Sequence, residues 1–275
     1  MKKMVGIMLL LCSIMPFMAC TSTEDEPYKP ETEQPSDDPN NNEEEDNDTT
    51  PVYGHLTTAN TVSDVVNHEA FNGFGRFILP AERSYNDNMT LQNVASMLPY
   101  HNYITGERAV ETINTMIDYV HDGNTLFYDI YSDADKQADS RKNNTAVFFF
   151  RGEPGKPFAI VSPGGGFSYV GAIHEGFPLA IALSKMGYNA FSIQYRTGGA
   201  QVACEDLAGA IDFIMRHAEE LQVSTDDYSL WGGSAGARMA AYLGSYGTQG
   251  FISAVHPRPA TVVMGYTGHS DYTRN

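Results

Sequence analysis

Cysteine is scarce in this chain, and that scarcity excludes a disulfide-stapled fold. Only three cysteines occur in 275 residues. Cys12 and Cys20 lie within the first 20 residues, so Cys204 stands alone in the rest of the chain. Its place near the start of a helical pattern, away from any histidine motif, favours a half-buried structural thiol over a nucleophile.

Basic clusters and metal-ligand patterns are also missing. The chain has 17 Lys and Arg against 34 Asp and Glu, which gives a net charge of −17 at neutral pH. An acidic chain without a basic patch does not attract the phosphate backbone of a nucleic acid, so no nucleic-acid partner is expected. No group of His, Cys, Asp or Glu has the spacing of metal ligands, so neither a metal nor another cofactor is expected.

Apolar runs are short, and the longest is at the N-terminus. Val5 to Ile14 follows two lysines, and Cys20 ends the segment. A basic start, a short apolar core and a small residue before a cysteine predict an export leader over 1–20, with Cys20 as the lipidated residue. Phe17 stands where such leaders usually carry leucine, so simple secretion stays open as the alternative. Since no run reaches the roughly 20 residues that a bilayer requires, we expect membrane attachment through the lipid anchor alone.

Residues 21–52 have almost no apolar side chains. Twelve acidic residues against Lys29 account for −11 of the net charge of −17. Such a segment buries too little surface to offset the entropy of ordering, so we expect a disordered acidic tether. It resembles the tethers of surface-displayed lipoproteins of Gram-negative bacteria, which implies a cell-envelope protein on the exposed side of the outer membrane. A plain solvated spacer is compatible with this reading.

The rest of the chain, 53–275, alternates between strand-like and helix-like patterns. This alternation predicts a single α/β domain with a doubly wound, mostly parallel sheet. Short apolar runs bounded by turn residues are the predicted strands, at 126–131, 146–151, 158–162, 190–195, 228–231 and 261–266.

Helical periodicity lies before and between these strands. Apolar residues recur at spacings of three and four over 110–120, 179–186 and 207–221. The first of these helices belongs to an N-terminal extension, 53–123, in which 54–96 carries no assignable pattern.

A Gly-x-Ser-x-Gly motif follows the fifth predicted strand. Gly232-Gly233-Ser234-Ala235-Gly236 closes an apolar run and opens a helical stretch, so the serine lies on a strand-to-helix turn. Such a turn is sharp enough to strain the serine backbone, which explains the small residues on both sides. Ser234 is therefore the candidate nucleophile.

A glycine-rich loop precedes the motif by about 70 residues. Ser162-Pro163-Gly164-Gly165-Gly166-Phe167 directly follows a buried-strand pattern. Backbone amides at Gly165 or Gly166, with that of Ala235, are predicted to form an oxyanion hole, since glycine leaves main-chain donors open to a developing negative charge. A phosphate-binding loop is disfavoured because Tyr169 occupies the last glycine position of that pattern, and a plain tight turn is the other alternative.

Together these stretches resemble the α/β-hydrolase fold, and within it the bacterial esterase-like lipoproteins similar to feruloyl and acetyl-xylan esterases. The resemblance also rests on Tyr195-Arg196 and Glu205-Asp206-Leu207, and it covers about 126–272. It implies a serine ester hydrolase that works through an acyl-enzyme on small-molecule or glycan esters. Proline and serine replace the histidine that often precedes the glycine loop in the family.

The acid and the base of a catalytic triad are the open part of this prediction. In the family the acid follows the sixth or seventh strand and the histidine the eighth, whereas 261–266 counts as the sixth strand here. We therefore expect a C-terminally incomplete domain without its last two strands, and impaired activity. Asp271 is a candidate acid of a sixth-strand variant, and His269 is read as a pocket or surface residue rather than as a base. Two alternatives stay open: a non-catalytic surface glycan-binding lipoprotein and a serine peptidase of the same fold.

Overall fold

The computed structural model describes residues 54–80, 82–83, 85–97 and 104–267. All of them belong to one compact unit, Thr50–Asn275. The predicted leader with Cys20, the tether, His269 and Asp271 lie outside the described residues, so the domain boundaries at 20 and 52 stay predictions. Within the described part of the chain, no helix combines the length and the apolar character that a membrane crossing needs.

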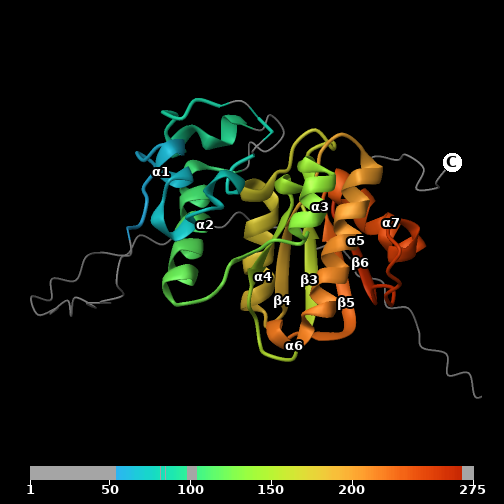
Figure 1. Cartoon of the computed structure of the whole chain (residues 1–275). Coiled ribbons are helices and arrows are strands. Elements are labelled where there is room, and N and C mark those ends of the chain that lie inside the picture. Colours follow the sequence, from blue (N-terminus) through green and yellow to red (C-terminus); the bar gives the residue numbers. More distant parts are fainter. Residues whose placement is uncertain (1–53, 81, 84, 98–103, 268–275) are drawn as a thin grey trace, which may run out of the picture. The chain divides into compact units, whose positions relative to one another are not determined.

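A six-stranded mixed sheet forms the centre of this unit (Figure 1). Its strands lie in the order β1-β2-β4-β3-β5-β6. β2 runs antiparallel to both of its neighbours, and the other three pairs are parallel, which confirms the predicted α/β class with a mostly parallel sheet. The strands are β1 Phe127–Tyr128, β2 Ala146–Phe150, β3 Pro157–Ser162, β4 Asn189–Gln194, β5 Ser224–Gly232 and β6 Thr261–Met264.

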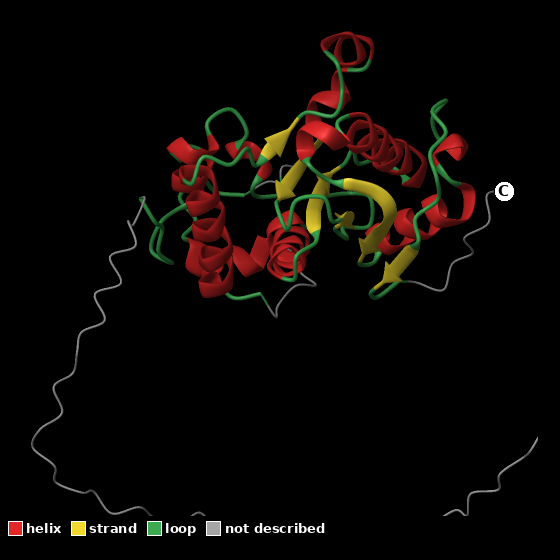
Figure 2. Cartoon of the chain, turned by 90° about the horizontal axis from the view of Figure 1, so that it is seen from below, coloured by secondary structure: helices red, strands yellow, loops and turns green. Residues whose placement is uncertain are grey.

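Helices lie on both sides of the sheet (Figure 2). The strand order explains their placement, because a crossover between parallel strands is right-handed. The step from β3 to β4 runs in one direction along the sheet, and the steps to β5 and β6 run in the other, so α4 covers one face and α5 and α7 cover the opposite face. The helices are α1 Val62–Val66, α2 Gly106–His121, α3 Asp133–Ala138, α4 Phe177–Lys185, α5 Ala200–Arg216, α6 Ala218–Leu221 and α7 Ala235–Tyr246.

The N-terminal extension consists of α1, α2 and short turns. Thr61 and Asp64 form a capping box at the start of α1, and the turns at Glu69–Phe71, Gly75–Phe77 and Leu91–Met97 are 3₁₀-helical. Phe74 stacks on Phe127 of β1 with ring centroids 4.9 Å apart, which joins this segment to the sheet. Because single turns are too short for apolar residues to recur at helical or strand spacing, the sequence of 54–96 shows no assignable pattern.

Three predicted elements differ from the structure. The periodic stretch 207–221 is not one helix, because it breaks at His217 between α5 and α6; there the ring Nδ1 and the backbone N–H both bond the Phe213 carbonyl. The predicted strands at 126–131 and 261–266 are shorter than expected. Cys204 is fully buried inside α5 rather than half-buried.

Candidate active site

The predicted strand-to-helix turn at Ser234 lies between β5 and α7, and we call residues 232–236 the elbow. Ser234 has φ 50° and ψ −116°, a backbone conformation that residues with a side chain rarely adopt. A methyl carbon on Gly236 would lie 2.5 Å from the carbonyl carbon of Ser162 and closer still to its oxygen, so α7 packs directly against the end of β3. Among the described residues, no side chain forms a hydrogen bond with the Ser234 hydroxyl. Because Ser234 follows the end of β5, its hydroxyl lies at the C-terminal edge of the sheet, where ligands bind in α/β proteins.

The glycine loop lies against this turn. A methyl carbon on Gly164 would lie 3.0 Å from Ser234 Cβ. The carbonyl of Gly164 accepts a hydrogen bond from the Gly171 amide at 2.9 Å, and the carbonyl of Gly165 accepts one from the Ser168 amide at 3.0 Å. Across a trans peptide the N–H points away from the carbonyl, so the amides of Gly165 and Gly166 are turned away from these contacts.

These two amides and that of Ala235 have the properties that an oxyanion hole requires. Within the described part of the chain, none of the three donates to a backbone or side-chain acceptor. Ala235 is the first residue of α7, so the partial positive charge of the helix N-terminus adds to its attraction for an anion. The structure therefore brings the predicted residues Ser234, Ala235 and the glycine loop together, and their catalytic roles stay predictions.

The buried Tyr195 and the partly exposed Glu175 hold the glycine loop in place. The Tyr195 hydroxyl, at the end of β4, donates to the Pro163 carbonyl at 2.7 Å. Burial raises the pKa of Tyr195 well above its usual range, so this donor stays protonated at any physiological pH. The Gly164 amide donates to Glu175 at 2.8 Å. The Glu175 carboxylate thus lies against the glycine loop.

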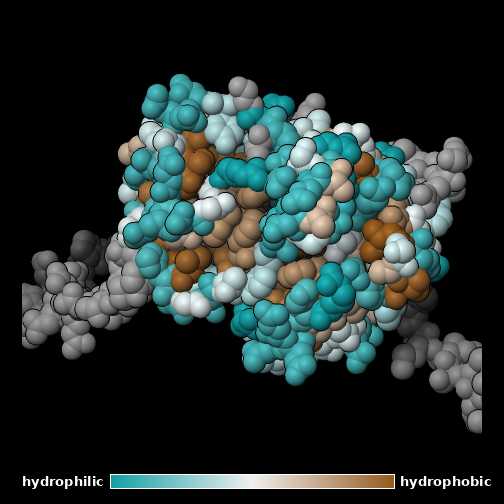
Figure 3. Space-filling view, in the orientation of Figure 1, coloured by the Kyte–Doolittle hydropathy of each residue, from teal (hydrophilic) through white to brown (hydrophobic). Residues whose placement is uncertain are grey.

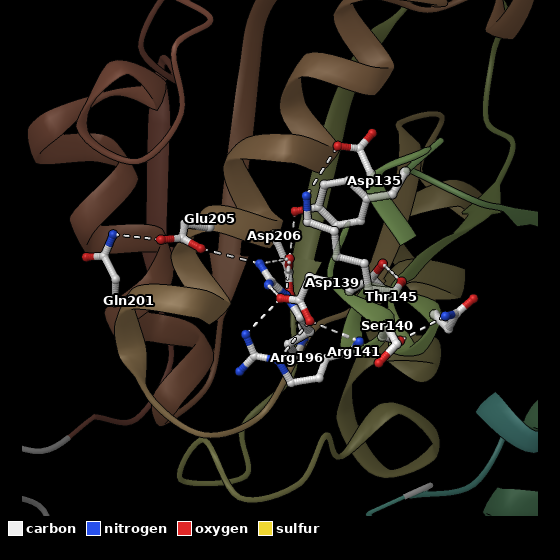
Figure 4. A network of polar contacts seen from close by, with 12 residues as sticks. Asp135, Asp139, Ser140, Arg141, Thr145, Arg196, Gln201, Glu205 and Asp206 are labelled. Carbon is white, nitrogen blue, oxygen red and sulfur yellow. Dashed lines mark hydrogen bonds and ion pairs between the residues drawn. The ribbon is translucent and has the colours of Figure 1, made fainter. Parts of the chain in front are cut away.

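An ion-pair network fixes the chain just after β4 (Figure 4). Arg196 is 4% exposed and pairs with the fully buried Asp206 of α5 at 2.8 Å. Asp206 also accepts a hydrogen bond from the Tyr131 hydroxyl at 2.7 Å, and Arg196 reaches Asp139 at 2.9 Å. The network joins β4, α5 and the segment after β1, and it lies among residues that carried the family resemblance. Its contacts are structural, since none reaches Ser234.

His256 is not placed to act as a base for Ser234. His256 Nε2 donates to the Asp212 carboxylate at 2.8 Å, which gives the histidine–carboxylate half of a triad. However, His256 precedes β6, and β5 and β6 are parallel, so this pair lies near the opposite edge of the sheet from the elbow. Within the described residues, no cluster of His, Cys, Asp and Glu has the arrangement of a metal site.

A hollow of about 270 Å³ lies between α2 and α4, where Figure 3 shows apolar surface. Its floor includes Ile104, Ile173 and Ile181, and its rim carries Arg108 and Lys185. None of the candidate catalytic residues lines it, so this hollow is separate from the elbow.

The chain is similar to known proteins over part of its length. A family model described as BD-FAE matches residues 153–258, which is less than half of the chain. No curated protein matches the chain. Similar solved structures include an alpha/beta hydrolase enzyme from a Medee basin deep-sea metagenome library, with 24% identity, a TM-score of 0.40, and coverage of 46% of this chain and 55% of that chain.

Two further solved structures are similar at the same level. Esterase 2 of Thermogutta terrifontis is 25% identical with a TM-score of 0.33, and 35% of this chain covers 40% of it. A sugar hydrolase from Lactococcus lactis is 22% identical with a TM-score of 0.38, and 48% of this chain covers 56% of it. The chain thus spans about half the length of the solved structures it matches.

The predicted fold is confirmed: the strand order, the turn at Ser234 and the BD-FAE match identify an esterase-like α/β-hydrolase fold.

Proposed function

We propose that this chain provides the nucleophile and the oxyanion hole of a serine ester hydrolase. One observation carries the proposal. Ser234 lies on a strained strand-to-helix turn beside the glycine loop, and the amides of Gly165, Gly166 and Ala235 have no acceptor in the described region. A fold keeps such strain and unused donors only where surrounding packing holds them in place, and they cluster at functional sites.

The geometry favours acyl transfer. Ser234 Oγ forms a bond to the ester carbonyl carbon while a general base takes the hydroxyl proton, and the carbonyl oxygen becomes an oxyanion. That oxyanion accepts hydrogen bonds from the amides of Gly165 or Gly166 and Ala235, which must approach it to about 2.7–3.1 Å. When the carbonyl re-forms, the bond to the leaving oxygen breaks, and the alcohol departs with the proton. Water then releases the acid by the same steps.

The general base belongs, in this proposal, to residues outside the described part of the chain. Substrates are esters on small molecules or glycans, the class that the family resemblance implies. The same resemblance and the predicted leader support a location at the cell surface, anchored through Cys20. Incorporation of labelled palmitate into the full chain, lost in Cys20→Ala, tests the lipid anchor, and cleavage of the tether by a protease added to intact cells tests the surface location.

The function is tested by hydrolysis of 4-nitrophenyl acetate by the full chain and by Ser234→Ala. We expect slow turnover by the wild type, in keeping with the impaired activity expected from the sequence, and only the buffer background from the variant. His269→Ala then tests whether that histidine acts as the base, with His256→Ala as the matched control, since His256 pairs with Asp212 near the far edge of the sheet. Hydrolysis that survives Ser234→Ala contradicts the proposal. A folded wild type that does not hydrolyse the ester and binds glycans favours the non-catalytic alternative.

A further inference from the structure

The carboxylate of Glu175 joins three separate segments at the elbow. Its Oε2 accepts a hydrogen bond from the Gly164 amide at 2.8 Å, and its Oε1 accepts one from the Tyr266 hydroxyl. A methyl carbon on Gly233 would lie 2.9 Å from Oε2, so the carboxylate also contacts the turn that carries Ser234. One side chain therefore links the glycine loop, the elbow and the residues after β6.

Tyr266 completes the connection from the other side. Its backbone carbonyl accepts a hydrogen bond from the Ser234 amide, while its hydroxyl bonds Glu175. The strand β6 ends at Met264, two residues earlier than predicted, and the chain then turns toward the elbow. Hydrogen bonds therefore connect the Ser234 backbone to Tyr266, Tyr266 to Glu175, and Glu175 to the glycine loop.

From these contacts we infer that Glu175 is a positioning residue, which fixes the direction of the oxyanion-hole amides. The inference rests on the proposed function for the meaning of those amides. Glu175 occupies the Gly164 N–H and Gly171 occupies the Gly164 carbonyl, so both sides of that residue are fixed. The next N–H, that of Gly165, is held in one orientation as a result. Gly164 itself is excluded as an oxyanion donor because its N–H is already used.

A carboxylate suits this task better than a neutral group. A charge-assisted hydrogen bond to a backbone amide is roughly twice as strong as a neutral one. The glycine loop needs such a contact, because Gly164, Gly165 and Gly166 have no side chains with which to pack and are free to take many backbone conformations. Preorganised donors contribute to catalysis only if they do not have to reorient when the oxyanion forms.

The experiment compares Glu175→Ala and Glu175→Gln in the full chain. The glutamine keeps an oxygen that can accept from Gly164, whereas alanine leaves that amide without its partner. We expect Glu175→Ala to lower kcat about 100-fold, near the cost of one lost oxyanion donor, with KM changed less than about 3-fold. We expect Glu175→Gln to stay within about 5-fold of the wild-type kcat, because it restores the contact.

Hydrogen exchange of the Gly164 amide gives a second measurement that does not depend on activity. Its protection should be lost in Glu175→Ala and kept in Glu175→Gln. Asp64→Ala is the matched control: the Asp64 carboxylate also accepts from a backbone amide, that of Thr61 at 2.7 Å, but in the capping box of α1. It should lower stability and leave both the Gly164 exchange and kcat unchanged.

The outcomes separate the inference from the proposed function. Unchanged Gly164 exchange in Glu175→Ala overturns the inference, and so does an unchanged kcat in an active enzyme. Loss of protection in Glu175→Ala, restored by glutamine, in a chain whose wild type does not hydrolyse esters supports Glu175 as the residue that holds the loop and refutes the proposed function alone.

Discussion

Replacing Gly236 with alanine tests whether the elbow depends on close contact between α7 and β3. The added methyl carbon would lie 2.5 Å from the Ser162 carbonyl carbon and 2.9 Å from the Pro163 carbonyl oxygen. Both atoms belong to the backbone, so no side-chain rotation relieves the overlap. Overpacking of this kind costs up to about 3 kcal/mol, and the better helix propensity of alanine returns about 1 kcal/mol. We expect a net loss of about 2 kcal/mol.

Gly244 provides the matched control on the same helix. A methyl carbon there would meet one methyl group of Val262 at 2.7 Å, and no backbone atom of another segment lies within 4 Å, so a small shift of that side chain relieves the overlap. The gain in helix propensity then roughly balances the repacking, so Gly244→Ala should unfold within about 1 kcal/mol of the wild type.

Thermal unfolding and reaction with a fluorophosphonate are the assays for this pair. A loss of about 2 kcal/mol corresponds to a fall in Tm of roughly 4–8 °C for a domain of this size. Because α7 must move, Ser234 and Ala235 move with it, and a displacement of about 1 Å lowers the labelling rate roughly 100-fold. Equal Tm values for Gly236→Ala and the wild type, or equal losses in both alanine variants, would refute the contact argument.

Three other predictions follow from buried or strained groups. Arg196→Met should lower the free energy of unfolding by about 3–5 kcal/mol, because it leaves Asp206 buried without its cation, and adding Asp206→Asn should recover part of that loss; a urea midpoint at the wild-type value for the single variant contradicts this. Burial raises the pKa of the Glu82 carboxyl above its ordinary value of 4.5. The folded chain therefore binds a proton on Glu82 more tightly than the unfolded chain does, and it loses stability as the pH rises through the raised pKa. Glu82→Gln should therefore have a higher urea midpoint than the wild type at pH 8 and the same midpoint at pH 4, and a constant difference at both pH values would show that burial of the charge is not the cause. Ser234→Gly should be more stable than Ser234→Ala by about 1 kcal/mol or more, because glycine relieves the positive φ; equal midpoints would mean that the turn is not strained.

Much of the sheet could be predicted because its strands are short, apolar and bounded by turn residues. Each predicted strand overlaps an observed one, and the largest differences are at strand ends. β5 begins at Ser224 rather than at Tyr228, since Ser224 pairs with Pro157 across an irregular register that no local pattern marks. Helix α3 was missed because it has six residues and no buried side chain, although Ser132 and Asp135 form a capping box at its start.

The parts of the candidate site that lie within short sequence motifs could be predicted, and the contacts between distant segments could not. The small residues around Ser234 predicted its turn, because a sharp strand-to-helix turn excludes bulk. The hydrogen bonds of Glu175 with Gly164 and Tyr266 span 11 and 91 positions of sequence, and residue spacing does not reveal them. Tyr195 was part of the family resemblance, but its bond to the Pro163 carbonyl came only with the fold.

The proposal that Ser234 is the nucleophile is tested most directly by intact mass spectrometry of the full chain after treatment with a fluorophosphonate. We expect one adduct per chain, formed on Ser234, absent from Ser234→Ala, and formed more slowly in Glu175→Ala. Adducts on other serines, or equal labelling of wild type and Ser234→Ala, would contradict it.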